Sequence, residues 1–393
     1  MILGKMCGLL MKAFLAVLML FVTAAAVEVC DEFGLEDAIN NRCAEIVLLP
    51  YEDGYYLDFG EPIEIDFDTE LDLGGNNLIS YFRITKGAKV TIKNGELNAS
   101  GDPILEVCGN SDEKNPTTLI LTDNLRLTAS NGVLIDSSDG YSRVELNETT
   151  INCASRNSNC IRVYGHSNQD ASTVVSVDRS NLYSRHDYVI GCNGNADISI
   201  SNSTIIGAGC ILLQGGEISV TNSILDAFLE FEYEDSPTGA IAFMPATNAA
   251  RVILTLGSGN QISSKSGAIF HIVPAAQGSV TVQIAITGGT FITENGHPLF
   301  SSPEGIKEVV GISGGSFPGI SLEESAALAP CLNENLTVDE NGNIVVKPQE
   351  AGVIIVQTDE KDRTQSNPST GAPINVIGQW ICSIVCWMLS GAR

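Results

Sequence analysis

The sequence is poor in cations and in aromatic residues. Its 393 residues include 21 Lys and Arg against 47 Asp and Glu, which gives a formal net charge of −26, and aromatic residues make up only 6%. A surface that binds nucleic acid needs a basic face to neutralise phosphates, so this composition excludes nucleic acid as an expected partner. With 44% hydrophobic and 17% charged residues, the composition also argues against a disordered chain.

The sequence also lacks Cys and His residues at the spacing of a metal site, and its middle part lacks apolar residues at the spacing of a helix. The four His residues form no cluster and the 11 Cys residues form no C-x-x-C pair, so a zinc site is not expected. In the middle of the chain the apolar residues do not follow the period of a helix. A short pattern typical of strands recurs there instead.

This recurring pattern is clearest from Ile198 to Ile205. Ile198 and Ile200 alternate with Ser residues, as in a strand with one buried face. Asn202 then marks a turn, and Ile205 resumes the buried face. Two further copies, at 120–127 and 254–262, fit this spacing less well. Six further copies share it fully, namely Val90-Ile92-Asn94-Leu97, Val144-Leu146-Glu148-Ile151, Val175-Val177-Arg179-Leu182, Ile218-Val220-Asn222-Leu225, Ile284-Ile286-Gly288-Phe291 and Val310-Ile312-Gly314-Phe317.

A further apolar strand follows most copies, at 104–107, 133–135, 161–163, 188–190, 211–213, 241–243 and 269–272. Copies start roughly 20 to 36 residues apart, which is too irregular for propeller blades. Stacked repeats pair their strand edges and bury continuous apolar columns. The sequence therefore predicts an all-β fold, a right-handed parallel β-helix from about residue 46 to 347, with the handedness that parallel crossovers favour.

The turn positions fit this fold. The residues that suit a left-handed corner are Asn94, Asn202, Asn222, Gly288 and Gly314. Stacked Asn side chains are expected to hydrogen-bond from one repeat to the next. Glu148 and Arg179 occupy the corner in two copies, so we expect them to interrupt this Asn ladder.

Residues 1–26 have the pattern of a secretory signal peptide. Two Lys residues precede an apolar run from Ala13 to Val22, and small residues follow up to Ala26. The run is short for a membrane-spanning helix, which is the alternative. We expect cleavage after Ala26 and an exported protein that begins at Val27.

Eight cysteines lie between the leader and the tail, and an even count in an exported chain permits disulfides. The likeliest local pairs are Cys30 with Cys43 and Cys153 with Cys160. The alternative is a set of buried, stacked thiols, because the repeat places two pairs at equivalent positions, Cys160 with Cys210 and Cys108 with Cys192. Both interpretations stay open at this point.

A short amphipathic helix is predicted ahead of the repeats, with one apolar face made of Phe33, Leu35, Ala38, Ile39 and Cys43. An apolar strand (46–49), an acidic stretch (61–70) and the segment Leu71 to Asn76 follow it. This order resembles the entry to pectate-lyase-like right-handed β-helices of bacterial surface proteins. The resemblance implies that the helix caps the open end of the solenoid and that Leu71 to Asn76 forms the first rung, meaning one full turn of the solenoid.

The end of the repeat region resembles a closing module of β-helical surface proteins from Gram-positive, Firmicutes-type bacteria. The segments that carry this resemblance are 312–317, 322–332 and 336–347, and 286–291 is a second copy of the Gly-Gly-Ser/Thr-Phe element. They predict a final rung, a short helix and a hairpin that turns at Asn341-Gly342. We expect this module to cap the second end.

The tail is similar to a cell-wall sorting signal. After a polar linker (348–366) come Asn367, Pro368, Ser369, Thr370 and Gly371, an apolar segment (376–389) and the terminal Arg393. This is an N-P-x-T-G variant of the common L-P-x-T-G string. The resemblance implies that a sortase cleaves between Thr370 and Gly371 and joins the Thr carbonyl to peptidoglycan. A membrane tail anchor or plain secretion is the alternative.

Two polar clusters are candidate sites. The best catalytic candidates are Arg185, His186, Asp187 and Asp170. Side chains alternate along a strand, so three consecutive charged residues cannot all face one groove, and a polar loop between rungs is the preferred interpretation. Alternate acids in a long excursion are weak candidates for a calcium site, namely Glu230, Glu232, Glu234 and Asp235, although a solvated face explains them as well.

The sequence thus divides into five segments, a signal peptide (1–26), a cap with the first rung (27–80), the solenoid with its closing module (81–347), a linker (348–366) and a sorting signal (367–393). The expected function is that of a cell-surface adhesin or scaffold without catalytic activity, which presents loops to a glycan or a protein. The alternative is a secreted polysaccharide lyase or glycoside hydrolase of the pectate-lyase-like superfamily. No cofactor is expected apart from a possible calcium ion.

The sorting signal yields a first prediction. Thr370→Ala should move the protein from the wall fraction to the membrane or the medium, because it alters the residue whose carbonyl the sortase attacks. Export and folding should not change, since Thr370 lies outside the repeats. Cell fractionation after muramidase digestion measures the distribution, with Ser369→Ala at the variable position as the control. A Thr370→Ala protein that still co-purifies with muramidase-released wall fragments would contradict the anchoring hypothesis.

Overall fold

The computed structural model describes residues 26–347 except 53, 58–60, 100–102, 139, 156–157, 166–172, 229–238, 247–248, 250, 266, 274–280, 295 and 302–308. These residues belong to one compact unit that ends at Lys347. The predicted linker and sorting signal, and all but the last residue of the predicted signal peptide, lie outside the described residues. Within the described ranges, no helix has both the length and the apolar character needed to span a membrane.

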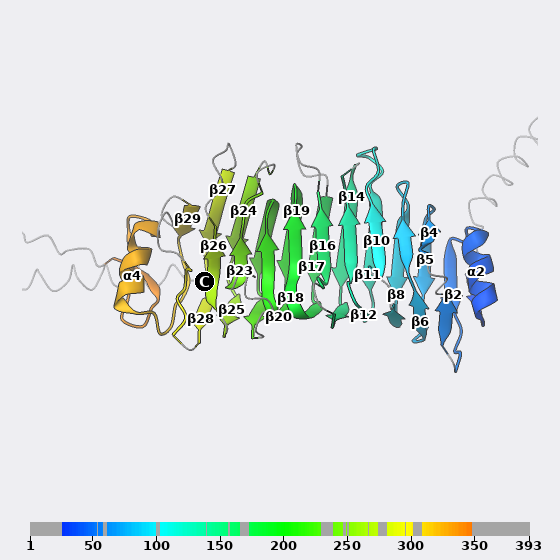
Figure 1. Cartoon of the computed structure of the whole chain (residues 1–393), viewed down its shortest axis with the longest axis horizontal. Coiled ribbons are helices and arrows are strands. Elements are labelled where there is room, and N and C mark those ends of the chain that lie inside the picture. The colour runs from blue at the N-terminus through cyan, green and yellow to red at the C-terminus, as the bar shows by residue number, and fades with distance from the viewer. Residues whose placement is uncertain are drawn as a thin grey trace, which may run out of the picture. The chain divides into compact units, whose positions relative to one another are not determined.

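The described chain forms a parallel β-helix, as the repeats predicted (Figure 1). Within the solenoid, strands pair in parallel with the equivalent strand one rung further along the chain. A 12-stranded sheet forms the first face, called face A. Its strands are β1 (Val27–Val29), β2 (Glu45–Leu48), β5 (Thr69–Asp72), β8 (Lys89–Lys93), β11 (Thr117–Thr122), β14 (Ser142–Asn147), β17 (Thr173–Asp178), β19 (Ala196–Ser201), β21 (Gly216–Thr221), β24 (Arg251–Leu256), β27 (Thr281–Ile286) and β29 (Val310–Ile312).

A 17-stranded sheet folds over the other two faces, because β18 (Asn181–Asn193) and β20 (Thr204–Leu213) run through both of them. Face B contains their first halves with β3 (Tyr55–Leu57), β6 (Asn77–Ser80), β9 (Glu96–Asn98), β12 (Arg126–Ala129), β15 (Thr150–Cys153), β22 (Ile224–Ala227), β25 (Gln261–Ser264) and β28 (Thr290–Thr293). Face C contains their second halves with β4 (Ile63–Ile65), β7 (Phe82–Ile84), β10 (Leu105–Cys108), β13 (Val133–Asp136), β16 (Ile161–Tyr164), β23 (Gly239–Phe243) and β26 (Ala268–Ile272).

The core consists of columns of inward side chains, one from each rung. Val177, Ile200 and Val220 are direct register partners on face A, and all three are buried. Their outward neighbours on the same strands are polar, which is the alternation that the sequence showed. Full burial of one such side chain contributes about 1.5–3 kcal/mol, so stacking stabilises every rung that has two neighbours.

The corner between faces A and B takes the predicted left-handed conformation. Asn94, Asn202 and Asn222 have φ values of 57°, 50° and 48°. Glu148 and Arg179 adopt φ values of 54° and 45° at the same corner, although their Cβ atoms make this region unfavourable. The rung geometry therefore determines the backbone conformation here even where the residue type opposes it.

At two corners the predicted glycine was displaced by one residue. The left-handed residues are Gly289 (φ 103°) and Gly315 (φ 123°) rather than Gly288 and Gly314. In the two poorly fitting copies the corner is one residue longer. Leu121, which ends the buried face of β11, and Leu127, which resumes it on β12, are six residues apart, whereas the equivalent Ile200 and Ile205 of a regular copy are five apart.

The predicted Asn ladder is replaced by a ladder of buried hydroxyls one residue later. The backbone N–H of Ser180 donates to Ser203 Oγ at 3.1 Å, and that of Ser203 donates to Ser223 Oγ at 3.1 Å. Thr149 starts this ladder and Asn260 continues it. These buried side chains satisfy N–H groups that the turn would otherwise leave without partners.

The corner Asn side chains bind acids on the preceding rung instead of each other. Asn94 donates to Asp72 at 3.0 Å, and Asn202 donates to Asp178 at 2.8 Å. The bonds from Asn202 and Ser201 hold the pKa of Asp178 below its usual value. Each of these pairs links two neighbouring rungs at the solvent-exposed edge.

The helix α2 (Glu32–Asn40) closes the N-terminal end. Asp31 caps it by accepting the Gly34 N–H at 2.7 Å, and Leu35, Ala38 and Ile39 are buried. Phe33, predicted to lie on the buried face, is 77% exposed. The first rung also starts earlier than predicted, because β1 precedes the helix and pairs in parallel with β2.

The C-terminal module has the predicted order of rung, helix and hairpin. After β29 come α4 (Leu322–Leu328), the 3-10 helix η1 (Ala329–Cys331) and an antiparallel pair, β30 (Leu336–Val338) with β31 (Ile344–Val346). Ser321 and Glu324 form a reciprocal capping box at the start of α4. The rings of Phe291 and Phe317, from the two Gly-Gly-Ser/Thr-Phe copies, stack at 4.9 Å.

The hydroxyl ladder yields a second prediction. Ser203→Ala removes the acceptor of the buried Ser180 N–H and should lower the free energy of unfolding by about 1–3 kcal/mol. Chemical denaturation measures this change. Ser199→Ala is the matched control, because Ser199 is exposed on β19 and should change stability by less than about 0.5 kcal/mol. Equal stabilities of the two variants would show that the ladder contributes nothing.

Candidate functional site

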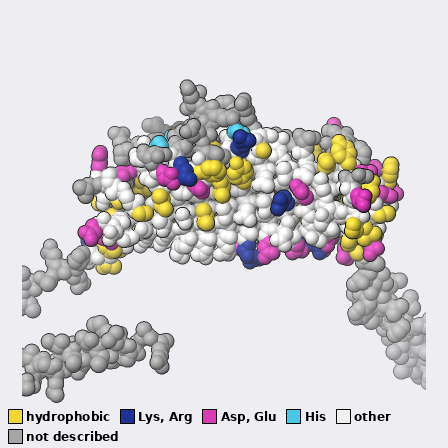
Figure 2. All heavy atoms as spheres, turned by 90° about the horizontal axis from the view of Figure 1, so that it is seen from below, with side chains coloured by type: hydrophobic (Ala, Val, Ile, Leu, Met, Phe, Trp, Pro, Cys, Tyr) yellow, Lys and Arg dark blue, Asp and Glu magenta, His cyan; other side chains and the backbone are white. Residues whose placement is uncertain are grey.

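An exposed patch of aromatic and aliphatic side chains lies on face B. We call Tyr183, Ile206, Ile224 and Phe228 the aromatic patch. Their side chains are partly exposed, and Ile224 reaches 44%. Figure 2 shows this side of the molecule, with hydrophobic side chains gathered near its middle and Lys, Arg and His side chains close by. Because outward positions on the neighbouring strands are mostly polar, this gathering is a candidate interaction site.

Strand register brings the patch together. Tyr183 on β18 pairs with Ile206 on β20, and Thr204 on β20 pairs with Ile224 on β22, so the patch spans three consecutive rungs. Phe228 follows directly after β22, and its ring centroid lies 6.5 Å from that of Tyr183 with the rings tilted by 36°. The ammonium group of Lys265 sits 5.9 Å from the Phe228 ring centroid. The two rings therefore form a small platform, with the Lys265 ammonium over the Phe228 ring.

Sequence reasoning missed this patch. The signal was a pair of adjacent apolar residues in three consecutive copies, Leu182-Tyr183, Ile205-Ile206 and Ile224-Leu225. In each pair one residue faces the core and the other faces out, because side chains alternate along a strand. Only the outward member contributes to the patch.

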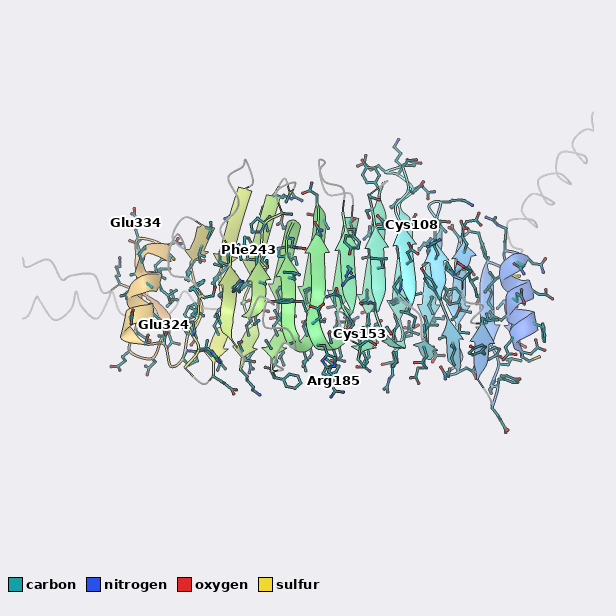
Figure 3. All side chains as sticks on the ribbon, in the orientation of Figure 1. Cys108, Cys153, Arg185, Phe243, Glu324 and Glu334 are labelled. Atoms are coloured by element: carbon teal, nitrogen blue, oxygen red, sulfur yellow. The ribbon has the colours of Figure 1, made fainter. Side chains whose placement is uncertain are left out.

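The predicted catalytic candidates Arg185, His186 and Asp187 lie next to the patch, within β18. They form a bulge between Ser184 and Tyr188, where the strand passes from face B to face C. The preferred expectation of a loop between rungs is therefore corrected, because these residues belong to a continuous strand. Arg185 points away from the solenoid and is exposed, without an ion pair to any described residue (Figure 3).

The carboxyl group of Asp187 is partly buried and interacts with Tyr188 and Arg162. Burial raises the pKa of its carboxyl, while the Tyr188 N–H, 2.7 Å from Oδ1, and the nearby Arg162 act in the opposite direction. Arg162 itself donates to Asn159 Oδ1 at 2.7 Å, and Asn159 donates to the Tyr188 carbonyl. This network fixes the corner that carries Arg185 to Asp187.

The other predicted site residues fall outside the described part of the chain. These are Asp170, the acids Glu230, Glu232, Glu234 and Asp235, and the sorting-signal residues Asn367, Pro368, Ser369, Thr370 and Gly371. Among the described residues, no group of three His, Cys, Asp or Glu side chains is arranged to hold a metal ion.

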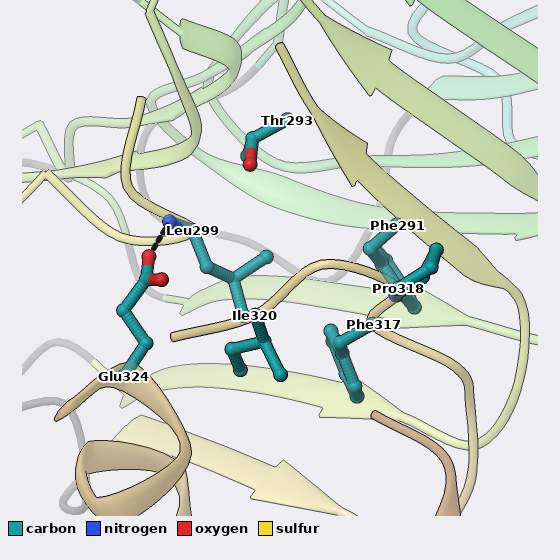
Figure 4. A pocket seen from close by; sticks show the side chains of 7 residues that line it. All are labelled: Phe291, Thr293, Leu299, Phe317, Pro318, Ile320 and Glu324. Carbon is teal, nitrogen blue, oxygen red and sulfur yellow. Dashed lines mark hydrogen bonds between the residues drawn. The ribbon is translucent and has the colours of Figure 1, made fainter. Parts of the chain in front are cut away.

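Two clefts of useful size lie elsewhere. One of about 550 Å³ opens between residues 296–301 and α4, where Glu324 accepts the Leu299 N–H at 2.8 Å. Figure 4 shows this bond beside a smaller adjoining pocket that the stacked Phe291 and Phe317 rings line. Because Glu324 also caps α4, its carboxylate serves the fold. The other is a shallow depression of about 330 Å³ over Ser199 and Ser219 on face A. Arg185, His186 and Asp187 line neither cleft.

In the structure no disulfide links any two of the described cysteines. Cys30 and Cys43 cannot pair, because they flank opposite ends of α2, which is about 13 Å long. Cys43 is tied to the far end by the bond from its N–H to the Ala38 carbonyl.

The predicted equivalence of cysteines holds for one pair only. Cys160 and Cys210 do occupy the same column, with Val189 between them. Cys108 is equivalent to Asn193 rather than to Cys192, because the predicted register was shifted by one residue. Burial raises the pKa of Cys192 to about 12.

No protein family, curated protein or solved structure matches this chain significantly.

The electrostatics of Asp187 yield a third prediction. A carboxyl with a raised pKa costs stability once it is ionised, so this cost is absent below its unfolded pKa and complete above its folded pKa. Asp187→Asn can keep the bond from Tyr188 and should therefore be more stable than the wild type at pH 7 but equally stable near pH 3.

Thermal unfolding at the two pH values measures the effect, with Asp178→Asn as the control of opposite sign. The pKa of Asp178 is lowered, so its contribution is present at pH 7 and is lost on acidification. A loss of stability in Asp187→Asn at pH 7 would mean that the charged carboxylate is needed at this corner.

Proposed function

We propose that the protein is an exported, wall-anchored adhesin that binds a glycan through the aromatic patch. The observation that carries this proposal is the platform of Tyr183 and Phe228, partly exposed on a face whose other outward positions are mostly polar. Large apolar groups exposed together on a soluble surface mark an interaction site.

The chemistry of the patch favours a sugar. An aromatic ring has a negative face, which attracts the weakly positive C–H groups on the apolar side of a sugar ring. Hydroxyl, amide and carboxylate groups flank the platform, and Asp226 already accepts a bond from Ser263 at 2.7 Å. Strands repeat about every 4.8 Å, so these groups recur at a spacing comparable to one sugar unit.

The scaffold suits this task because it holds the patch rigidly. Tyr183, Ile206 and Ile224 are carried by strands that are paired on both sides. A preorganised platform loses little conformational freedom on binding, which favours affinity for a flexible chain of sugars. A sortase and peptidoglycan would then be the partners that attach this scaffold to the wall through Thr370.

A secreted polysaccharide lyase or glycoside hydrolase is the second candidate. One observation favours it, the half-buried Asp187 with a raised pKa beside Arg162. A carboxyl group with a raised pKa is suited to proton transfer. Hydrolysis needs a second carboxylate across the scissile bond, and the predicted partner Asp170 lies outside the described residues. A calcium ion at Glu230 to Asp235 likewise stays a proposal.

Glycan binding yields a fourth prediction. On an array of plant, host and bacterial glycans, Tyr183→Ala and Phe228→Ala should each weaken binding of the exported protein about tenfold, since each removes one stacking ring. Tyr56→Ala is the matched control, because Tyr56 lies on the same face and is 54% exposed but stands apart from the patch.

The same samples separate the two candidates. The adhesin should release no unsaturated or reducing-end products from the glycans that it binds. Turnover that disappears in Asp187→Ala would establish the enzyme instead. Unchanged binding in both ring variants would remove the aromatic patch from consideration.

A further inference from the structure

Two buried thiols face each other within one rung, directly beneath the corner of face B. Cys153 ends β15 and Cys160 precedes β16, and both are completely buried. The Cys153 thiol lies 3.5 Å from the carbonyl oxygen of Asn159, the residue before Cys160. The Cys160 thiol lies 3.7 Å from the carbonyl oxygen of Ile151, two residues before Cys153. The Cys160 thiol also donates to the Tyr183 carbonyl of the next rung at 3.1 Å. The two thiols interact directly with each other, so the sulfur atoms are neighbours.

The other buried cysteines lack such a neighbour. Val189 separates Cys160 from Cys210 in the same column, so these two lie two rung spacings apart, about 9.6 Å. This exceeds the Cα separation of about 4.4–6.8 Å that a disulfide spans. Cys192 instead donates to the Gly215 carbonyl at 3.1 Å.

We propose that Cys153 and Cys160 are an oxidisable pair and form a disulfide that ties β15 to β16, in the rung next to Tyr183 of the aromatic patch. The bond would close a short loop within one rung. It would join the end of a face B strand to the start of a face C strand. This inference does not depend on what the patch binds.

The oxidant required is a disulfide, carried by a small molecule or by a thiol oxidoreductase. The Cys153 thiolate attacks it, forms a mixed disulfide and releases one thiol. The Cys160 thiolate then attacks the Cys153 sulfur and displaces the second thiol. Two protein S–H bonds are thereby replaced by one S–S bond, and the oxidant disulfide is reduced to two thiols.

Burial determines when this exchange takes place. In the folded protein desolvation raises the pKa of Cys160 well above its usual value, so the reactive thiolate is scarce and is shielded from any oxidant. Oxidation therefore occurs before the next rung, which contains Tyr183 and Ser184, packs over the pair.

The proposed disulfide would stabilise the corner of β18 that carries Arg185 to Asp187. Ser184 donates to the Ser158 carbonyl at 2.6 Å, and Asn159 donates to the Tyr188 carbonyl. The acceptor residue Ser158 and the donor residue Asn159 are the two residues directly before Cys160. Fixing Cys160 to Cys153 therefore restrains the two anchor points of the bulge that contains Arg185.

The experiment is to refold the full chain in a buffer of oxidised and reduced glutathione, then to unfold it and alkylate its free thiols. The wild type should contain one linked peptide pair joining Cys153 to Cys160, with both residues protected from alkylation. Reduction should lower the melting temperature by a few degrees, as expected for a short loop. The double variant Cys153→Ala/Cys160→Ala should lose this dependence on reductant.

The matched control is Cys192→Ala, which should keep both the linked peptides and the dependence on reductant. Alkylation of Cys153 and Cys160 in the oxidised wild type would overturn the proposal, and so would linkage of either residue to Cys210. Because peptide mapping reads the wild-type chain directly, the result does not depend on whether a variant folds. Loss of glycan binding on its own would leave this outcome unchanged.

Discussion

The fold depends on a fixed corner between faces A and B. At that corner one residue takes the left-handed conformation and the next points a buried hydroxyl at the adjacent rung, as Asn202 and Ser203 do. The bend sets the angle between two faces, and the hydroxyl sets the register between two rungs. Once both are fixed, the inward residues of successive rungs must fall into columns, and the core follows.

The sequence predicted the columns of inward residues, because apolar residues that alternate with polar ones along a strand are easy to recognise. Val177, Ile200 and Val220 could be aligned by eye, and the structure stacks them. It did not predict the hydroxyl ladder, since Ser203 after Asn202 has the composition of an ordinary turn. The role of Ser203 comes from a neighbour about twenty residues away, which local composition does not encode.

The errors in the candidate site have the same origin. A shift of one residue reverses the side of a strand, so Cys108 was matched to Cys192 when Asn193 is its true equivalent. The charged run beginning at Arg185 was placed in a loop because its strand contains a bulge, which breaks the alternation that identifies strands. The aromatic patch was hidden because its members come from different rungs and meet only after stacking.

The stacked phenylalanines of the C-terminal module have a mechanical consequence. Hydrogen bonds between rungs run along the solenoid axis, so tension applied at Lys347 would peel the rungs away one at a time rather than shear them together. The β30–β31 hairpin bears this load first, through bonds such as that from the Lys347 N–H to the Asn335 carbonyl. The rings of Phe291 and Phe317 bear it next, with Phe270 and Phe300 behind them. Ring stacking at this end therefore holds the last rungs together, and its strength limits the force at which these rungs separate.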